Sequence, residues 1–285
     1  MNSICDVPGI RVGHADDKDA RTGCTVVLPA SPAVAGVDVR GSAPGTREVE
    51  LLHPVRLVQH VDAIALCGGS AFGLDAVTGV HNYLAEQNRG FDTGVRRVPI
   101  VPAAVLFDLA VGRSDIWPDA EMGYNACLNA SEHYDHDPAT GAGCGATVAK
   151  AAGMQYASRG GIGTSSIKLP NGIIIGALTA VNAFGEIINP DKNEIIAGVR
   201  SDKKPAFIPT LSLLKQGQAE AFSSNTTLSV VATNAGLNRE QTTKVAQMAQ
   251  TGLSRSIRPA HTMWDGDIVF VLSCGALQAD VSVIG

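Results

Sequence analysis

The chain has 285 residues, of which 45% are hydrophobic, with 31 glycines and only 5% aromatic residues. This length and composition can bury one large core, and many small residues suit closely packed β/α layers. The formal net charge of −5 leaves no broad basic surface, which argues against nucleic-acid binding.

No membrane or secretion signal stands out. No apolar run reaches the roughly 18–20 residues of a membrane span. Residues 1–6 lack the charged and apolar regions of a signal peptide. The six cysteines are scattered without CxxC spacing, which is typical of reduced thiols rather than of a disulfide framework. We therefore expect a cytoplasmic protein.

The beginning of the chain predicts short strands joined by turns. Residues 4–14, 21–29 and 34–39 have strand-like patterns, and the last is followed by a break at 41–45. Thr46 is a candidate N-cap for a short helix over 48–52.

A buried strand over 61–67 then runs into Gly68 and Gly69 and a helix near 74–87. This step resembles a phosphate loop or a nucleophile elbow. It lacks the P-loop lysine, and Gly73 follows Ser70 by three residues instead of two. A tight turn is the simpler interpretation, with lining of a pocket by the N–H groups of Gly68 and Gly69 as a second role.

The middle of the chain offers two motifs that resemble ligand sites. Residues 98–109 contain two prolines and predict an edge strand or extended wall, and 120–130 predict a helix. The two His and two Asp of 133–137 lack a second ligand pair, so a solvated loop is favoured over a metal site. Residues 141–150 predict a glycine loop entering a helix that carries Lys150, but lack the context of an NAD fingerprint.

Residues 160–168 and 172–181 predict strands, the second buried on both faces. That strand delivers Asn182, a buried amide that needs hydrogen-bond partners. It is either a turn residue or a donor to an oxyanion.

Residues 191–217 are polar and predict a mobile linker, and 228–233 predict the next strand. An amphipathic helix follows over 238–253, capped by Asn238. The segment Asp265-Gly266-Asp267 then precedes a strand over 268–273, and is a plain turn or a partial cation loop with too few ligands for an EF-hand.

The Asn225–Thr226 bond joins a polar segment to an apolar β-type run. Most such dipeptides are turn residues leading into a strand. Cleavage of this bond would leave Thr226 with both a hydroxyl and a free α-amine. Because an α-amine has a pKa near ~8, part of it can accept the hydroxyl proton at neutral pH. That pairing is a known activated nucleophile.

Four segments occur in the order GAGCGATVAK, AVNAFGEI, SNTTLSVVATN and RPAHTMWDGDIVF. With them, nearly the whole chain resembles the DmpA-type L-aminopeptidase/D-esterase family, which includes β-aminopeptidases and the 6-aminohexanoate-oligomer (nylon) hydrolase. The resemblance implies a single α/β domain, residues 1–285, folded as a four-layer αββα sandwich of the N-terminal-nucleophile-hydrolase type. It also implies self-cleavage into 1–225 and 226–285, no cofactor or metal, and a homo-oligomer, a tetramer of processed pairs.

The resemblance assigns roles to individual residues. Thr226 matches the nucleophile, and Asn182 matches the residue that holds the nucleophile and the oxyanion. Lys150 matches a lysine of the nylon hydrolase. Asp265 and Asp267 match its paired acids. Because acids two residues apart on a strand point to the same side, we expect Asp267 to orient Asp265, which would hold Thr226 or bind a substrate's free amine.

Phe107 falls where the nylon hydrolase has a tyrosine. Because a phenyl ring cannot donate a hydrogen bond, Tyr124 or Tyr156 supplies that contact, or the substrate differs. Phe107, Gly68 and Gly69 are the expected substrate-binding residues.

These observations predict a self-processing amidohydrolase or aminopeptidase that cleaves small peptides or amides through an acyl-enzyme on Thr226. Two alternatives stay open. An acyltransferase would use the same threonine but accept an amine in place of water, and an unprocessed binding protein would keep an intact chain. The choice among L-, D- and β-aminoacyl peptides and linear amides is also open.

Overall fold

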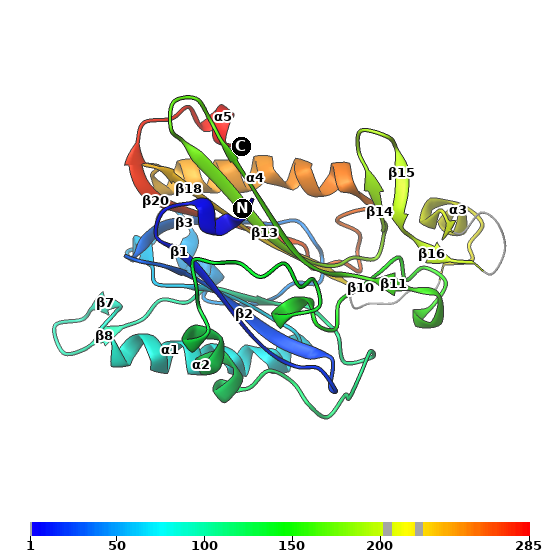
Figure 1. Ribbon diagram of the computed structural model, residues 1–285, viewed down its shortest axis with the longest axis horizontal. Coiled ribbons are helices and arrows are strands. Elements are labelled where there is room, and N and C mark those ends of the chain that lie inside the picture. The colour runs from blue at the N-terminus through cyan, green and yellow to red at the C-terminus, as the bar shows by residue number, and fades with distance from the viewer. Residues whose placement is uncertain (1, 202–206, 220–224) are drawn as a thin grey trace.

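The two larger β-sheets of the molecule lie face to face, and each is covered on its outer side by helices (Figure 1). This computed structural model describes residues 2–201, 207–219 and 225–285. The arrangement is the predicted four-layer αββα sandwich.

The first sheet has the strand order β1-β2-β6-β9-β4, in which only the β6–β9 pair is parallel. Its strands are β1 (Ile10–Asp17), β2 (Thr22–Pro29), β6 (Ile64–Cys67), β9 (Ala103–Val105) and β4 (Gly45–Arg47). Helices α1 (Ala76–Glu86) and α2 (Ala120–Leu128) pack on its outer face and against each other.

The second sheet has the order β12-β13-β18-β20-β3-β5, with the long strands β18 and β20 parallel at its centre. Its strands are β12 (Gly161–Lys168), β13 (Ile174–Asn182), β18 (Thr226–Ala235), β20 (Ile268–Leu277), β3 (Ala33–Val39) and β5 (His60–Val61). Helix α4 (Arg239–Ser256) lies across its outer face, with α5 (Val281–Ile284) beside it (Figure 1).

Shorter elements connect the sheets and extend one end of the sandwich. The strands are β7 (Phe91–Asp92), β8 (Arg97–Val98), β10 (Thr147–Val148), β11 (Ser158–Arg159), β14 (Glu186–Asn189), β15 (Glu194–Ala197), β16 (Val199–Arg200), β17 (Phe207–Ile208) and β19 (Ile257–Arg258). The helical turns are η1 (Ile4–Asp6), η2 (Val49–Leu52), η3 (Ser70–Asp75), η4 (Gly141–Gly143), η5 (Met154–Tyr156) and α3 (Thr210–Lys215).

The main core lies between the two sheets. Strand residues alternate between faces, so Leu228 and Val230 of β18 point inward with Ile64 and Leu66 of β6. The opposite faces of β18 and β20 pack on α4 in a second apolar cluster. At Gly36 of β3 an added Cβ would lie 2.4 Å from the α4 backbone, so this glycine allows the close approach of helix and sheet.

Helix α4 follows the predicted pattern. The side chain of its N-cap, Asn238, accepts from the backbone N–H of Gln241, whose side chain accepts from the Asn238 N–H. This capping box satisfies two donors that a helix start leaves unpaired.

Five local predictions were wrong. Residues 141–150 form turns and the short strand β10, because this segment crosses over to pair with β11 instead of continuing as a helix. The predicted N-cap Thr46 lies in β4, and η2 begins after Glu48 instead. The segment predicted as an edge strand contains β9, which is an inner strand of the first sheet.

The other two wrong predictions concern the burial of β13 and the segment expected to be a linker. Strand β13 alternates between buried and half-buried residues, because α4 does not cover its outer face completely. The predicted linker over 191–217 contains β15, β16, β17 and α3. Lys203, Lys204 and Pro205 of that linker lie outside the described residues.

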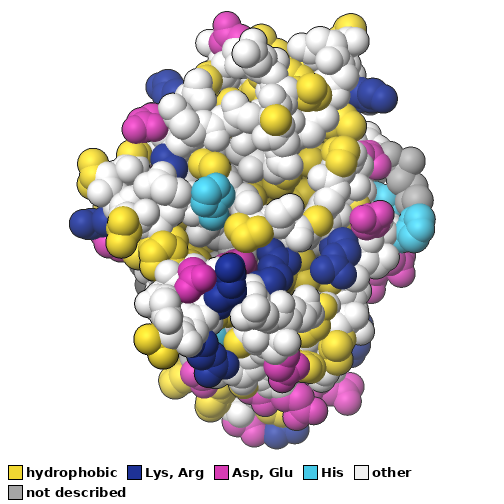
Figure 2. Space-filling model, turned by 90° about the vertical axis from the view of Figure 1, so that its left-hand side faces the viewer, with side chains coloured by type: hydrophobic (Ala, Val, Ile, Leu, Met, Phe, Trp, Pro, Cys, Tyr) yellow, Lys and Arg dark blue, Asp and Glu magenta, His cyan; other side chains and the backbone are white. Residues whose placement is uncertain are grey.

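On the face drawn in Figure 2, basic, acidic and hydrophobic side chains are interspersed. Among the helices that the structure describes, none combines the length and the hydropathy needed to cross a membrane.

Candidate active site

Thr226 is the first residue of β18 and pairs with Asn182, the last residue of β13. Both are buried, with exposed fractions of 5% and 0%. Thr226 borders a cavity of about 200 Å³. The cavity is lined by Ala43, Pro44, Gly45, Ser70, Ala71, Val105, Leu106, Phe107, Asn225 and Thr226.

The carbonyl oxygen of Asn225 accepts two hydrogen bonds. The Thr226 hydroxyl donates to it at 2.5 Å, and the backbone N–H of Gly266 donates at 2.7 Å. The hydroxyl thus lies against the carbonyl of the peptide bond that precedes its own residue. The N–H of Gly266, from the loop before β20, polarises the same carbonyl.

Gly266 reaches this carbonyl because the loop before β20 is held tightly. The backbone N–H groups of Arg40 and Ala43 donate to the carbonyl oxygens of Asp267 and Asp265, at 3.0 Å each. A Cβ at Gly266 would lie 2.7 Å from the Ala43 oxygen and 2.8 Å from the Thr226 hydroxyl. Only glycine therefore fits at this point without displacing a neighbour.

Asn182 connects three segments of the site. Its Oδ1 accepts from the Thr147 backbone N–H and from Lys150 Nζ, each at 2.9 Å. Its Nδ2 donates to the Phe107 carbonyl at 2.9 Å. The amide is thus oriented from both ends, next to the strand position occupied by Thr226.

Lys150 is buried, with an exposed fraction of 1%, and Nζ also donates to the backbone oxygen of Asn182 at 2.9 Å. Burial lowers the pKa of its amine to about 7, although the charges of Asp265 and Asp108 oppose this shift. The residue lies in a turn after β10 rather than on a helix, and its backbone N–H donates to Phe184. Near neutral pH part of this amine is therefore unprotonated.

Asp265 is buried beside the Asn225–Thr226 joint and forms an isolated β-bridge with Asn225. Its Oδ1 accepts from the Phe184 backbone N–H at 3.1 Å, and its Oδ2 accepts from the backbone and hydroxyl of Thr262. Burial raises the pKa of this carboxyl, and the charge of Asp267 adds to the effect.

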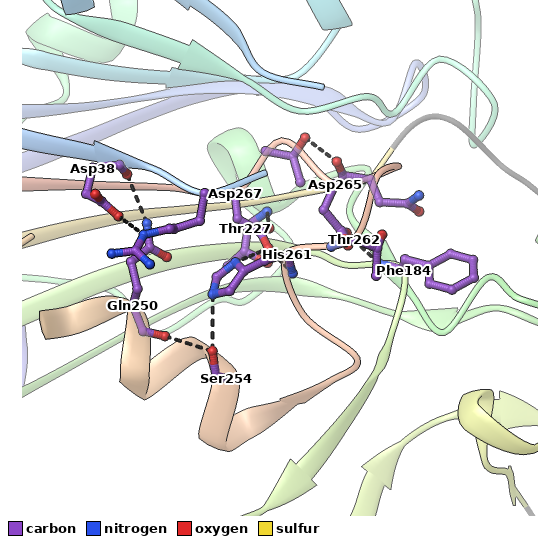
Figure 3. A network of polar contacts seen from close by, with 12 residues as sticks. Asp38, Phe184, Thr227, Gln250, Ser254, His261, Thr262, Asp265 and Asp267 are labelled. Carbon is purple, nitrogen blue, oxygen red and sulfur yellow. Dashed lines mark hydrogen bonds and ion pairs between the residues drawn. The ribbon is translucent and has the colours of Figure 1, made fainter. Parts of the chain in front are cut away.

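Asp267 contacts a different set of groups (Figure 3). Its Oδ1 accepts from the Thr227 backbone N–H at 2.7 Å, and its Oδ2 accepts from the backbone N–H of His261 and faces the ring Nδ1 of His261 at 2.9 Å. The two acids precede β20 instead of lying on it. The prediction that Asp267 orients Asp265 is therefore wrong: Asp267 holds the residue after Thr226, and Asp265 holds the loop at Phe184.

The glycine turn after β6 does not present the N–H groups that the sequence suggested. The N–H of Gly68 donates to the Gly23 carbonyl, and that of Gly69 donates to Asp108 Oδ1 at 2.7 Å. Neither glycine lines the cavity, which is bordered instead by the next two residues, Ser70 and Ala71. The turn therefore leads into the cavity wall, but its two glycine N–H groups are already bonded elsewhere.

Asp108, which the sequence analysis did not single out, does not line the cavity but holds Gly69 and influences the charge of Lys150. It is 1% exposed, and burial raises its pKa to about 6. Its position at the end of an apolar run was the available signal, because an acid in such a run is rarely buried without a specific partner.

Phe107 lines the cavity, and its carbonyl orients Asn182. The two tyrosines proposed as substitute donors lie elsewhere. Tyr124 donates its hydroxyl to Glu86 at 2.7 Å, and Tyr156 is 43% exposed on η5 and does not line the cavity.

His133 is exposed on a loop, as is His136, whose ring packs edge-on against Tyr134. Within the described ranges, no three His, Cys, Asp or Glu side chains gather in a way that could hold a metal ion.

Comparisons with known proteins cover nearly the whole chain. The family model described as peptidase family S58 matches residues 2–283. An uncharacterized aminopeptidase from Mycobacterium tuberculosis (strain H37Rv) is 44% identical over an alignment of 295 residues, gaps included. The alignment covers 97% of this chain and 83% of the relative. A 6-aminohexanoate-oligomer endohydrolase from Kocuria sp. (strain KY2) is 27% identical over 278 residues, covering 94% and 74% of the two chains.

Solved structures agree with the fold. A Burkholderia sp. beta-aminopeptidase is similar with a TM-score of 0.66 and 25% identity, over 96% of this chain and 73% of the other. The L-aminopeptidase D-Ala-esterase/amidase from Ochrobactrum anthropi, described as a variant of the Ntn hydrolase fold, has a TM-score of 0.69 at 18% identity, over 96% and 74%.

Proposed function

The chain belongs to peptidase family S58, and from this membership we propose that it is a self-processing hydrolase of amide bonds with Thr226 as its N-terminal nucleophile. The membership confirms the resemblance drawn from the four sequence segments. It also supports the broad activity, hydrolysis of peptide or amide bonds.

The two donors on the Asn225 carbonyl carry the proposal. In the cleavage step the Thr226 oxygen attacks the carbonyl carbon of Asn225, and the Gly266 N–H stabilises the charge that develops on the carbonyl oxygen. The C–N bond then breaks, and the hydroxyl proton ends on the threonine nitrogen. The result is an ester between Asn225 and the Thr226 hydroxyl.

Water completes the cleavage. Its attack on the ester releases Asn225 as a carboxylate and frees the hydroxyl and α-amine of Thr226. The threonine then carries its own base, since an α-amine with a pKa near ~8 is partly neutral at physiological pH.

Lys150 is suited to accept a proton before that amine exists. Its lowered pKa of about 7 leaves part of its amine neutral, and it is held to Asn182, the strand partner of Thr226. This supports a role for Lys150 as the proton acceptor of the cleavage step.

In this proposal the N–H of Gly266 also takes part in substrate turnover. Once Asn225 has left, the Gly266 N–H loses its acceptor and is available to the carbonyl oxygen of a substrate in the same position. Thr226 attacks that carbonyl, the amine leaves with a proton, and water hydrolyses the resulting acyl-enzyme. The cavity of about 200 Å³ and its mostly small lining residues favour small peptides or amides.

The direct test is an intact-mass measurement of the purified protein under denaturing conditions. We expect two species corresponding to residues 1–225 and 226–285, and Edman sequencing of the smaller one should begin at Thr226. A single species at the full 29.5 kDa that persists on prolonged incubation would contradict the proposal. Preferential use of an added amine over water by the processed protein would identify an acyltransferase instead.

A further inference from the structure

A chain of polar groups runs from helix α4 to the backbone of the nucleophile strand (Figure 3). Ser254 Oγ lies 3.1 Å from His261 Nε2, and His261 Nδ1 lies 2.9 Å from Asp267 Oδ2. The other oxygen of Asp267 accepts from the Thr227 N–H at 2.7 Å. Three links thus connect Ser254 to the residue that follows Thr226.

The hydrogen-bond pattern assigns the protons of His261. Ser254 has one hydroxyl proton, which it donates to the Gln250 carbonyl at 3.2 Å, so it accepts from His261 Nε2–H. Nδ1 faces a carboxylate and must also carry a proton. With the Ser254 hydroxyl on the Gln250 carbonyl, these contacts are satisfied by an imidazolium, whereas a neutral ring requires that hydroxyl to turn toward Nε2.

We propose that His261 is a positioning residue of the reaction: its imidazolium, held between Ser254 and Asp267, offsets the charge of the carboxylate that fixes the backbone beside Thr226. The raised pKa of His261, caused mainly by its hydrogen bond to Asp267, agrees with this assignment. This inference rests on the proposed function, because the group it acts on is the α-amine of processed Thr226.

The consequence follows from charge. An uncompensated Asp267 carboxylate one residue from the new N-terminus would stabilise the protonated amine and raise its pKa. The imidazolium opposes this effect. It therefore keeps more of the Thr226 amine in the neutral form that accepts the hydroxyl proton.

The other charged groups around His261 do not replace this effect. Asp265 lies on the same loop and acts in the same direction as Asp267. The nearby charges from β3 and the residue after it are those of Asp38 and Arg40, which pair with each other at 2.6 Å. On α4, His261 contacts the uncharged side chain of Ser254 and the backbone of Gln250.

His261→Asn separates charge from geometry. His261 has φ of 56°, in the left-handed region that asparagine also tolerates, so the backbone is kept. The amide donates to Asp267 but cannot carry a positive charge. His133→Asn, on an exposed loop, is the matched control.

The experiment measures the pKa of the Thr226 α-amine by NMR in processed, ¹⁵N-threonine-labelled protein, together with the pH profile of kcat/KM on alanine 4-nitroanilide. In His261→Asn we expect the amine pKa to rise by about one unit. The acid limb should move to higher pH by the same amount, giving roughly a tenfold loss of kcat/KM below that limb. His133→Asn should match the wild type.

Two outcomes would contradict the inference separately from the proposed function. A processed His261→Asn protein with the wild-type amine pKa would overturn the role of His261 alone. An unchanged ring pKa of His261 in Ser254→Ala, where Nε2–H loses its acceptor, would contradict the proton assignment. An intact wild-type chain would instead overturn the proposed function and, with it, the inference.

Discussion

Lys150 Nζ lies 2.9 Å from both the backbone oxygen and the side-chain Oδ1 of Asn182. This contact joins a buried amine to the strand residue that pairs with Thr226. Because the two residues come from separate segments, the surroundings of Thr226 depend on how β13 and the turn after β10 are packed together.

Thr226→Ala removes the hydroxyl that lies 2.5 Å from the Asn225 carbonyl. We expect loss of both chain cleavage and amide hydrolysis, whereas Thr226→Ser should keep part of each because it keeps the nucleophilic oxygen. Mass spectrometry and steady-state kinetics measure the two activities. Hydrolysis by Thr226→Ala at the wild-type rate would remove Thr226 from the mechanism.

Asn182→Ala removes the amide that is held by Lys150 and by the Phe107 carbonyl. We expect turnover to fall by one to three orders of magnitude, about the effect of losing one oxyanion donor or its support. The comparison should use equal amounts of cleaved chain. Asn189→Ala, at the end of β14, is the matched asparagine control, and an Asn182→Ala rate equal to the control would count against this role.

Lys150→Met tests the buried amine by the pH dependence of chain cleavage. The wild-type rate should increase as pH rises through about 7, where Lys150 loses its proton. In Lys150→Met this increase should disappear and cleavage should slow at least tenfold. A rate profile that keeps its rise near pH 7 would assign the proton acceptor to another group.

Gly266→Ala tests the N–H that polarises the Asn225 carbonyl. The new Cβ would lie 2.8 Å from the Thr226 hydroxyl and 2.7 Å from the Ala43 oxygen, so the loop must shift. We expect cleavage to slow by a factor of 100 or more, as for loss of one oxyanion donor. Gly163→Ala, where an added Cβ meets nothing within 4 Å, is the control and should cleave normally.

Asp108→Asn should stabilise the protein at neutral pH. Burial raises the folded-state pKa to about 6 from the ordinary 3.8, so between these values the folded state holds more protons and stability falls as pH rises. The amide keeps an acceptor for Gly69 without the charge. Urea unfolding should show a gain on the order of 3 kcal/mol at pH 7 that disappears below about pH 3. Asp115→Asn, which is exposed, serves as control, and an equal gain there would contradict the explanation.

Local pattern predicted much of the fold. Helix α4 could be recognised from its N-cap Asn238 and its apolar side, and β18 from its apolar run, because both signals come from residues close in sequence. The segment 141–150 was predicted wrongly because its glycine-rich pattern suits a helix start, whereas long-range pairing of β10 with β11 decided its conformation.

The sequence by itself determined which chemistry the chain can carry. Thr226 at a polar–apolar joint, a buried asparagine after an apolar strand and two acids two residues apart were all visible along the chain. The resemblance of four sequence segments to known motifs also indicated the fold, since four segments in a defined order restrict the topology.

Only the tertiary structure decided which groups meet. The contact of Gly266 with the Asn225 carbonyl joins residues 41 positions apart, and that of Asp108 with Gly69 joins residues 39 positions apart. Likewise, the burial that lowers the pKa of Lys150 exists only once the sheets have packed. Such contacts leave no periodic signal in sequence, because hydrogen bonds and desolvation depend on distance in space rather than along the chain.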